Sequence, residues 1–283
     1  MTSDGRQSVP REHATVLGVA WYWVVAIAVL VVALLVLIVV SAARASTEQA
    51  TAQRAASAYT PPALPTVAPV ASFSQAVDRL KDTSRPWTVA VVGDSTGYGP
   101  ERWVDQFATQ VSLERKRQVV LHDWNDESLQ YDPAKTIGSG GAAITIWNAA
   151  APGRGPDYSR AHLSTMIPKG ITPDVIIINH GHNVGPDIAV DTNGLISALR
   201  FKYRTAPFAY TVQNPFRSDT AAEQEARASD ELAYATEHGW RVIDVYDAFT
   251  SQPALAPLYE DDRHENAKGG LLWAQTVMKA TGI

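Results

Sequence analysis

A long stretch without charge constrains this chain more than any other feature. No charged residue occurs between Ala14 and Ala43, and most of the residues there are Val, Leu, Ile or Ala. As a helix rising about 1.5 Å per residue, the segment from Val16 to Val40 would be about 37 Å long, which exceeds the roughly 30 Å hydrocarbon thickness of a bilayer. The sequence therefore predicts one transmembrane helix over residues 16–43.

This segment can be a lasting anchor or a cleaved signal peptide. Ala43-Arg44-Ala45 has the small-x-small form of a cleavage site, but the apolar region of a signal peptide is only about 7–15 residues long. We therefore predict an uncleaved signal-anchor. Arginines are nearly balanced on its two sides, so the orientation follows from the short N-terminal tail, residues 1–15. We expect a single-pass protein of the cell membrane with its C-terminal domain outside the cytoplasm.

Residues 44–71 are rich in Pro, Ala and Thr. Proline fixes φ and disfavours helix in the residue before it, so the stretch from Tyr59 to Pro65 should be extended. It reads as a linker that holds a globular domain, residues 72–283, away from the membrane.

Composition excludes several classes of function. The chain has no cysteine, which excludes disulfides, thiolate metal sites and a cysteine nucleophile. Its formal charge of −5 provides no basic surface, so we expect no nucleic-acid partner.

From residue 72 onward, short apolar runs alternate with segments of helical spacing. The runs that indicate buried strands are Trp87–Val92, Val119–Leu121, Ala143–Trp147, Val175–Ile178, Phe208–Val212 and Trp240–Val245. Helices are predicted over Glu101–Glu114, Thr220–His238 and Leu271–Lys279. Strands alternating with helices predict an α/β domain, a parallel sheet with helices on both faces, whose sites lie in loops at the carboxyl ends of the strands.

Polar residues suited to acyl transfer follow several of these strands. Ser95 lies in Gly93-Asp94-Ser95-Thr96-Gly97, directly after the first strand, where a turn can expose its hydroxyl near a helix N-terminus. Gly153 and Asn183 follow two later strands, and a glycine N–H or an asparagine amide can stabilise an oxyanion without adding charge. Taken alone, the Ser95 segment fits an ordinary tight turn equally well, and Gly153 and Asn183 fit an ordinary loop and turn better than a catalytic role.

A base and a carboxylate stand close together near the C-terminus, in Asp261-Asp262-Arg263-His264. A serine nucleophile needs a general base, and that base needs an orienting carboxylate. Asp261 can meet His264 across one tight turn. Asp244 and Asp247, after the last strand, are the alternative acids.

In the order and spacing of these blocks the sequence resembles the SGNH (GDSL-type) hydrolase family. The matching segments are Gly93-Asp94-Ser95, Asn148 with Gly153, Gly181-His182-Asn183, and Asp261-x-x-His264 followed by Asn266 and Gly269. The resemblance covers about Arg85 to the C-terminus. Two positions depart from the family pattern, since Val184 replaces the usual aspartate and Glu265 the usual proline.

The resemblance implies a flavodoxin-like three-layer α/β/α sandwich and an esterase that works through an acyl-serine. Ser95, Asp261 and His264 would form the catalytic triad, and Ser95, Gly153 and Asn183 the oxyanion hole. No cofactor and no metal are expected. The expected substrate is an acyl ester with a short, acetyl-like acyl group, carried by a glycan of the cell envelope.

Other interpretations stay open from the sequence. Gly-x-Ser-x-Gly also occurs at the nucleophile elbow of α/β-hydrolases, but there the serine follows several strands and the acid lies far upstream of the histidine. His180 and His182 could suggest a metal site, although the sequence offers no convincing carboxylate partner for them. A surface O-acyltransferase with the same triad and a noncatalytic carbohydrate-binding domain are the alternative functions.

Overall fold

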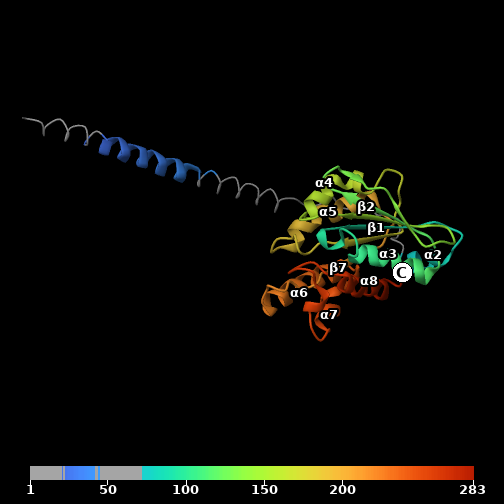
Figure 1. Cartoon of the computed structure of the whole chain (residues 1–283). Coiled ribbons are helices and arrows are strands. Elements are labelled where there is room, and N and C mark those ends of the chain that lie inside the picture. The colour runs from blue at the N-terminus through green and yellow to red at the C-terminus, as the bar shows by residue number, and fades with distance from the viewer. Residues whose placement is uncertain (1–20, 22, 42–43, 45–71) are drawn as a thin grey trace, which may run out of the picture. The chain divides into compact units, whose positions relative to one another are not determined.

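The computed structural model describes residues 21, 23–41, 44 and 72–283 (Figure 1). The chain divides into two units, Met1–Leu64 and Pro65–Ile283, and each is described here by itself. The predicted N-terminal tail, residues 1–15, and the predicted linker apart from Arg44 lie outside the described residues.

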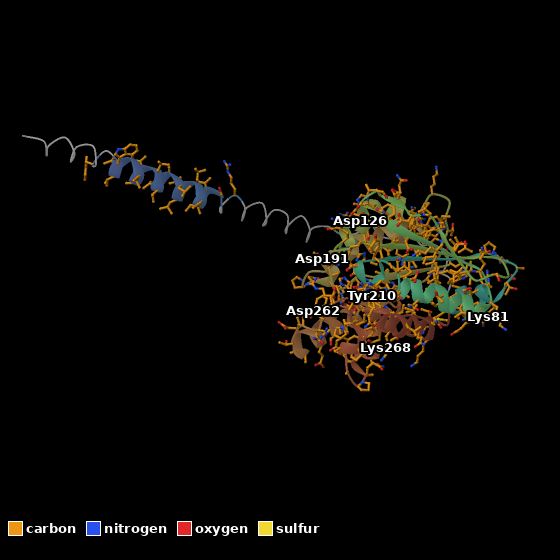
Figure 2. The ribbon with its side chains drawn as sticks, in the orientation of Figure 1. Lys81, Asp126, Asp191, Tyr210, Asp262 and Lys268 are labelled. Atoms are coloured by element: carbon orange, nitrogen blue, oxygen red, sulfur yellow. The ribbon has the colours of Figure 1, made fainter. Side chains whose placement is uncertain are left out.

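One helix in the first unit, Trp23–Ser41, is long and apolar enough to cross a membrane, with a mean hydropathy of 3.5. Trp21 and Arg44 are helical as well. The large apolar side chains of this helix are exposed, and they project from it as mostly orange carbon sticks in Figure 2. Length and composition fit a membrane anchor and a signal sequence alike.

The second unit is built on one sheet of eight strands in the order β3-β2-β5-β1-β6-β7-β8, with β4 paired to β2. The strands are β1 (Trp87–Gly93), β2 (Val119–Asn125), β3 (Gln130–Tyr131), β4 (Lys135–Ile137), β5 (Ile144–Ala150), β6 (Val175–Asn179), β7 (Phe208–Val212) and β8 (Arg241–Asp244). Every predicted strand is present. The short strands β3 and β4, which pair antiparallel with β2, were not predicted.

The strands β5-β1-β6-β7-β8 are parallel throughout, and they reproduce the flavodoxin order 2-1-3-4-5. Strand β2 extends this sheet in parallel beyond β5. The predicted α/β class with a central parallel sheet is therefore confirmed. Strands β2 and β5 lie on one side of β1 and strands β6, β7 and β8 on the other, so the strand order reverses at β1. The carboxyl end of β1 is therefore the switch point where such folds place their sites.

Helices cover both faces of the sheet (Figure 1). They are α2 (Phe73–Lys81), α3 (Trp103–Arg115), α4 (Pro156–Met166), α5 (Ile188–Lys202), α6 (Ala221–Glu237), α7 (Val245–Thr250) and α8 (Ala267–Thr281). Val89 and Val91 of β1 belong to the core with α2, α3, α7 and α8, whereas Ala90 and Val92 belong to the core with α4, α5 and α6. The alternation of side chains along β1 thus separates the two cores.

Local signals explain where the predicted helices begin and end. Helix α6 begins after Thr220, which forms a capping box with Glu223. Helix α8 begins after Asn266, whose side chain accepts from two N–H groups of the first turn, and it ends at Gly282 in the left-handed conformation. Helices α2, α4, α5 and α7 were not predicted.

Candidate active site

Three strands of the sheet end in register, and this brings the candidate residues together. Gly93, the last residue of β1, pairs with Ala150 of β5 on one side and with Asn179 of β6 on the other. Each of these is the last residue of its strand. The loops carrying Ser95, Gly153 and Asn183 therefore leave the sheet at one level.

Ser95 is the first residue of a short 3₁₀ turn, η1 (Ser95–Gly97). Asp94 caps this turn by accepting from the Thr96 N–H, and the Asp94 N–H donates to the Asn179 carbonyl at 3.2 Å. The Asn148 amide donates to the Gly97 carbonyl at 2.9 Å. The turn is thus held by the ends of β5 and β6, so the Ser95 hydroxyl has a fixed place in the fold.

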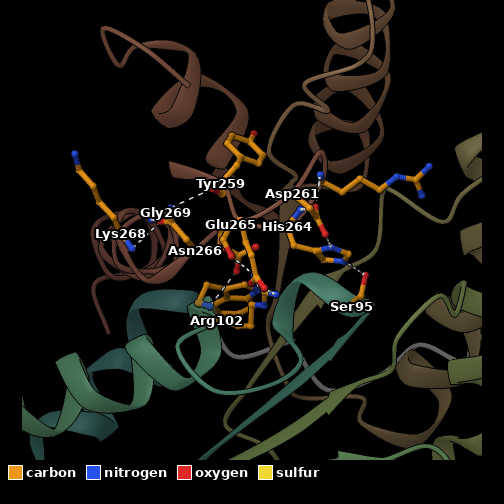
Figure 3. A network of polar contacts seen from close by, with 12 residues as sticks. Ser95, Arg102, Tyr259, Asp261, His264, Glu265, Asn266, Lys268 and Gly269 are labelled. Atoms are coloured by element: carbon orange, nitrogen blue, oxygen red, sulfur yellow. Dashed lines mark hydrogen bonds and ion pairs between the residues drawn. The ribbon is translucent and has the colours of Figure 1, made fainter. Parts of the chain in front are cut away.

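The structure places His264 against both of its predicted partners (Figure 3). His264 Nε2 lies 2.8 Å from Ser95 Oγ, and His264 Nδ1 lies 2.8 Å from Asp261 Oδ2. Ser95 is 169 positions away from His264 in sequence. With the Nδ1 proton facing Asp261, Nε2 carries the lone pair that accepts from the serine hydroxyl.

Asp261 is held by three hydrogen bonds. Its Oδ1 accepts from the Arg263 and His264 N–H groups, each at 2.7 Å, in addition to the contact of Oδ2 with the His264 ring. Burial raises the pKa of Asp261, but these hydrogen bonds and the adjacent imidazole outweigh it and lower the pKa well below its usual range. Asp261 is therefore ionised and oriented before any substrate arrives.

The alternative acids, Asp244 and Asp247, lie at the start of α7. Asp244 is the N-cap of α7 and accepts from the Asp247 N–H at 2.9 Å. The carboxylate that contacts the His264 ring belongs to Asp261.

The predicted donors lie in the two loops that flank the serine turn. Gly153 is exposed and has φ +66°, a left-handed conformation that favours glycine. The main chain at Gly155 packs against Asn183, since a Cβ added there would lie 2.8 Å from the Asn183 carbonyl oxygen. Within residues 72–283, the Ser95 and Gly153 N–H groups and the Asn183 side-chain amide donate no hydrogen bond to protein. All three donors are therefore available.

A buried polar network beneath the turn depends on Gln213, which directly follows β7. Its amide nitrogen lies 3.1 Å from Asp94 Oδ2, 3.2 Å from Thr96 Oγ1 and 3.1 Å from the Asn179 carbonyl oxygen. Its carbonyl oxygen accepts from the His182 N–H at 2.5 Å. Gln213 thus links the serine turn to the loop that carries Asn183.

His180 and His182 are not placed as a metal site. His180 Nε2 lies 2.9 Å from Ser159 Oγ, and His182 Nε2 lies 2.8 Å from the Asn214 carbonyl oxygen. Burial lowers the pKa of each to about 3, so both rings are neutral. No group of three or more His, Asp or Glu residues in the described part of the chain is arranged to hold a metal ion.

Comparison with known proteins gives a consistent set of solved structures. No family model and no curated protein matches the chain. A two-domain esterase active on acetylated mannans superposes with a TM-score of 0.52 at 15% identity, over 74% of this chain and 52% of that one. A lipase/acylhydrolase from Enterococcus faecalis superposes with a TM-score of 0.50 at 17% identity, over 69% and 96%.

A protein assigned to the SGNH hydrolases, from Slackia heliotrinireducens, matches over 70% of this chain and all of its own length, with a TM-score of 0.50 at 13% identity. The domain has the SGNH hydrolase fold. The mostly parallel sheet flanked by helices belongs to this shared fold.

The two departures from the SGNH sequence pattern lie in different surroundings. Val184 is half-buried in the loop after β6, and its N–H donates to the Gly181 carbonyl. Glu265 is fully buried beside His264. Neither side chain replaces one of the candidate catalytic groups.

Several residues that surround the candidate site were missed from the sequence. Gln213 and Asn214 directly follow a predicted strand, so the strand-end rule that selected Ser95 and Asn183 could have found them. Glu231 lies on α6 at helical spacing from the buried Ala228 and Ala235, which places it on the buried face. Arg102 and Glu265 gave no such signal, because they meet only in the folded chain.

Proposed function

We propose that the domain is a serine esterase that cleaves short acyl esters through an acyl-serine intermediate. The observation that carries this proposal is the continuous chain of 2.8 Å contacts from Asp261 through His264 to Ser95 Oγ. A hydroxyl, an imidazole and an ionised carboxylate in this arrangement are the parts that nucleophilic acyl transfer requires. The SGNH fold, shared with solved esterases and lipases, supports the same reaction class.

The proposed reaction has two halves. Ser95 Oγ attacks the acyl carbon while His264 Nε2 takes the hydroxyl proton, and the Ser95 N–H, the Gly153 N–H and the Asn183 amide bind the oxyanion. The tetrahedral intermediate collapses, the alcohol leaves with the proton from His264, and Ser95 carries the acyl group. Water, deprotonated by His264, then releases the carboxylic acid and restores the serine hydroxyl. Throughout the reaction Asp261 stays ionised and accepts the hydrogen bond from His264 Nδ1–H.

Exposure of the site favours water over a sugar hydroxyl as the acyl acceptor. The His264 side chain is 25% exposed and that of Asp261 is 54% exposed, so water reaches the base directly. A transferase must keep water from the acyl-enzyme. We therefore favour hydrolysis over the surface O-acyltransferase, and the intact triad favours catalysis over a noncatalytic carbohydrate-binding role.

The proposed substrate is an acetylated glycan of the cell envelope. Two considerations support it: a solved structure with this fold is an esterase active on acetylated mannans, and the apolar helix Trp23–Ser41 fits a membrane anchor. We propose that this helix holds the enzyme in the cell membrane with the domain outside the cytoplasm.

The triad is tested with the domain's activity on p-nitrophenyl acetate. Ser95→Ala and His264→Ala should each lower kcat by about 10⁴–10⁶-fold, and the double variant little further, because triad members act as a unit. Asp261→Ala should cost about 10³–10⁴-fold, whereas Asp244→Asn, which keeps an acceptor for the Asp247 N–H, should stay within a few-fold of the parent. Full activity in Ser95→Ala would refute the proposal.

Release of acetate from acetylated glycans in the absence of an added sugar acceptor separates hydrolysis from transfer.

A further inference from the structure

Glu265 directly follows His264 and occupies the position where SGNH sequences usually have proline. The side chain is fully buried, with 0% exposure. Carboxyl groups are almost never fully buried without partners, because removing them from water is costly. The partners of Glu265 therefore indicate what the residue does.

The side chain of Glu265 caps helix α3 from a distant part of the sequence. Glu265 Oε1 accepts from the Trp103 N–H at 3.2 Å, across 162 positions. Trp103 is the first residue of α3, and the N-cap residue Arg102 makes no side-chain capping bond of its own. The first N–H groups of a helix have no partner within the helix, so Glu265 supplies the acceptor that α3 otherwise lacks.

The backbone around Glu265 is fixed as well (Figure 3). Arg102 donates to the Glu265 carbonyl oxygen, and its second terminal nitrogen pairs with Glu260 Oε2 at 2.8 Å. The Glu260 N–H in turn donates to the His264 carbonyl oxygen at 2.9 Å. The two sides of the loop that carries His264 are thus hydrogen-bonded to each other and to Arg102.

These contacts attach the histidine loop to the segment that carries the nucleophile. Ser95 and Trp103 belong to one stretch of chain, the turn after β1 and the start of α3. The loop meets this stretch where His264 contacts Ser95 and where the Glu265 side chain contacts Trp103, and Arg102 of the same stretch holds the Glu265 carbonyl oxygen and Glu260. A second attachment one residue beyond the base restricts how far His264 can move from Ser95.

We propose that Glu265 is a positioning residue that holds His264 at hydrogen-bonding distance from Ser95 by capping α3. This inference rests on the proposed esterase function. It also accounts for the departure from proline: proline leaves the loop without this side-chain attachment, and glutamate provides one.

The chemical state of Glu265 indicates which substitution should preserve the role. Burial raises the pKa of Glu265 to about 8, against the opposing effect of Arg102, so the group is largely neutral near pH 7. A neutral carboxyl group presents one carbonyl oxygen to the Trp103 N–H, and a glutamine amide presents the same acceptor. Within residues 72–283, Glu265 Oε2 has no hydrogen-bond partner.

The test compares Glu265→Gln with Glu265→Met on p-nitrophenyl acetate. The two side chains have similar length, and only glutamine can accept from Trp103. We expect Glu265→Gln to keep kcat within about threefold of the parent. Glu265→Met should lower kcat about 10- to 100-fold with KM unchanged, because displacement of a catalytic group by about 1 Å costs rate rather than binding. In Glu265→Met the rate at which a fluorophosphonate labels Ser95 should fall by about the same factor as kcat.

Controls separate positioning from folding. Glu260→Gln removes the negative charge that pairs with Arg102 at the surface and should leave kcat near the parent value. Circular dichroism at the assay temperature identifies unfolded protein. If Glu265→Met does not fold, Glu265→Asp, which withdraws the acceptor by one carbon, replaces it with the same expected loss.

A parental kcat in the folded Met or Asp variant, or an equal loss in Glu265→Gln, would overturn the positioning role. Ser95→Ala is measured in parallel. If it is inactive while Glu265→Met is normal, only the positioning role fails; if it is active, the esterase proposal itself fails.

Discussion

The side-chain amide of Asn183 is unpaired within residues 72–283, while the hydrogen-bonding groups of the adjacent His182 are paired with other residues. The adjacent His182 is held through both its main-chain N–H and its ring, by Gln213 and Asn214. The Asn183 carbonyl faces Gly155, and its side-chain amide donates to no group within residues 72–283. In the proposed mechanism this unused amide binds the oxyanion, which appears only during the reaction.

Asn183→Ala should therefore lower kcat by about 10²–10³-fold, the usual cost of removing one oxyanion donor. KM should change little, because the donor acts on charge that develops in the transition state. Steady-state kinetics with p-nitrophenyl acetate measures both constants. The melting temperature should stay near that of the parent, because the amide makes no structural hydrogen bond. A near-normal kcat would assign Asn183 a structural role in the loop.

At the scale of elements, helix α6 is joined to the sheet by a buried carboxyl group. Glu231 is 2% exposed, and its Oε2 accepts from the Gln213 N–H at 2.9 Å. Burial raises the pKa of Glu231 to about 8; Arg227 opposes this shift, and Asp94 and Asp244 add to it. The contact places a titratable group directly behind the residue that links the serine turn to the Asn183 loop.

This arrangement predicts a pH-dependent stability. Glutamate in the unfolded chain titrates near 4.5, so between that pH and about 8 the unfolded state loses a proton that the folded state keeps. The contribution of Glu231 is fully present below pH 4.5 and is lost as pH rises towards 8, by at most about 1.4 kcal/mol per pH unit. Glu231→Gln keeps the acceptor for Gln213 and does not titrate.

Urea unfolding of the parent and of Glu231→Gln at pH 5, 6.5 and 8 measures this effect. The free energy of unfolding of the variant, relative to the parent, should increase with pH. A difference that stays constant across the range would show that Glu231 does not titrate between the two states. The analogous buried acid Glu265 is present in both proteins, so its contribution cancels in the comparison.

At the scale of the whole molecule, the proposed topology depends on helix Trp23–Ser41 and on the uncharged stretch around it. If the helix is retained as an anchor with the domain outside, protease added to intact cells should release an active fragment by cutting between residues 46 and 71. Activity in the supernatant and the N-terminus of the fragment measure this outcome. A domain protected until lysis would contradict the orientation, and a soluble protein that begins near Ala45 without added protease would indicate a cleaved signal peptide.

Much of the architecture follows from the sequence alone, because it depends on local patterns. Runs such as Val175–Ile178 are apolar on both faces, which is typical of strands buried in a parallel sheet. Capping signals at Thr220 and Asn266 place the starts of α6 and α8. Asp261 and His264 lie within one turn of each other, so their contact needed no long-range information.

Tertiary structure alone decided which distant groups meet. The register that aligns Gly93 with Ala150 and Asn179 brings three loops to one level, and the sequence does not encode that register in any short segment. Trp103 and Glu265 lie 162 positions apart, and no local sequence pattern at either residue predicts their contact. Gln213 becomes a link only because β7 lies beside β6. The sequence by itself indicated the buried strands, helices α3, α6 and α8 and the reactive groups, since these arise from local spacing. The contacts that hold the groups in place arise from how the sheet assembles.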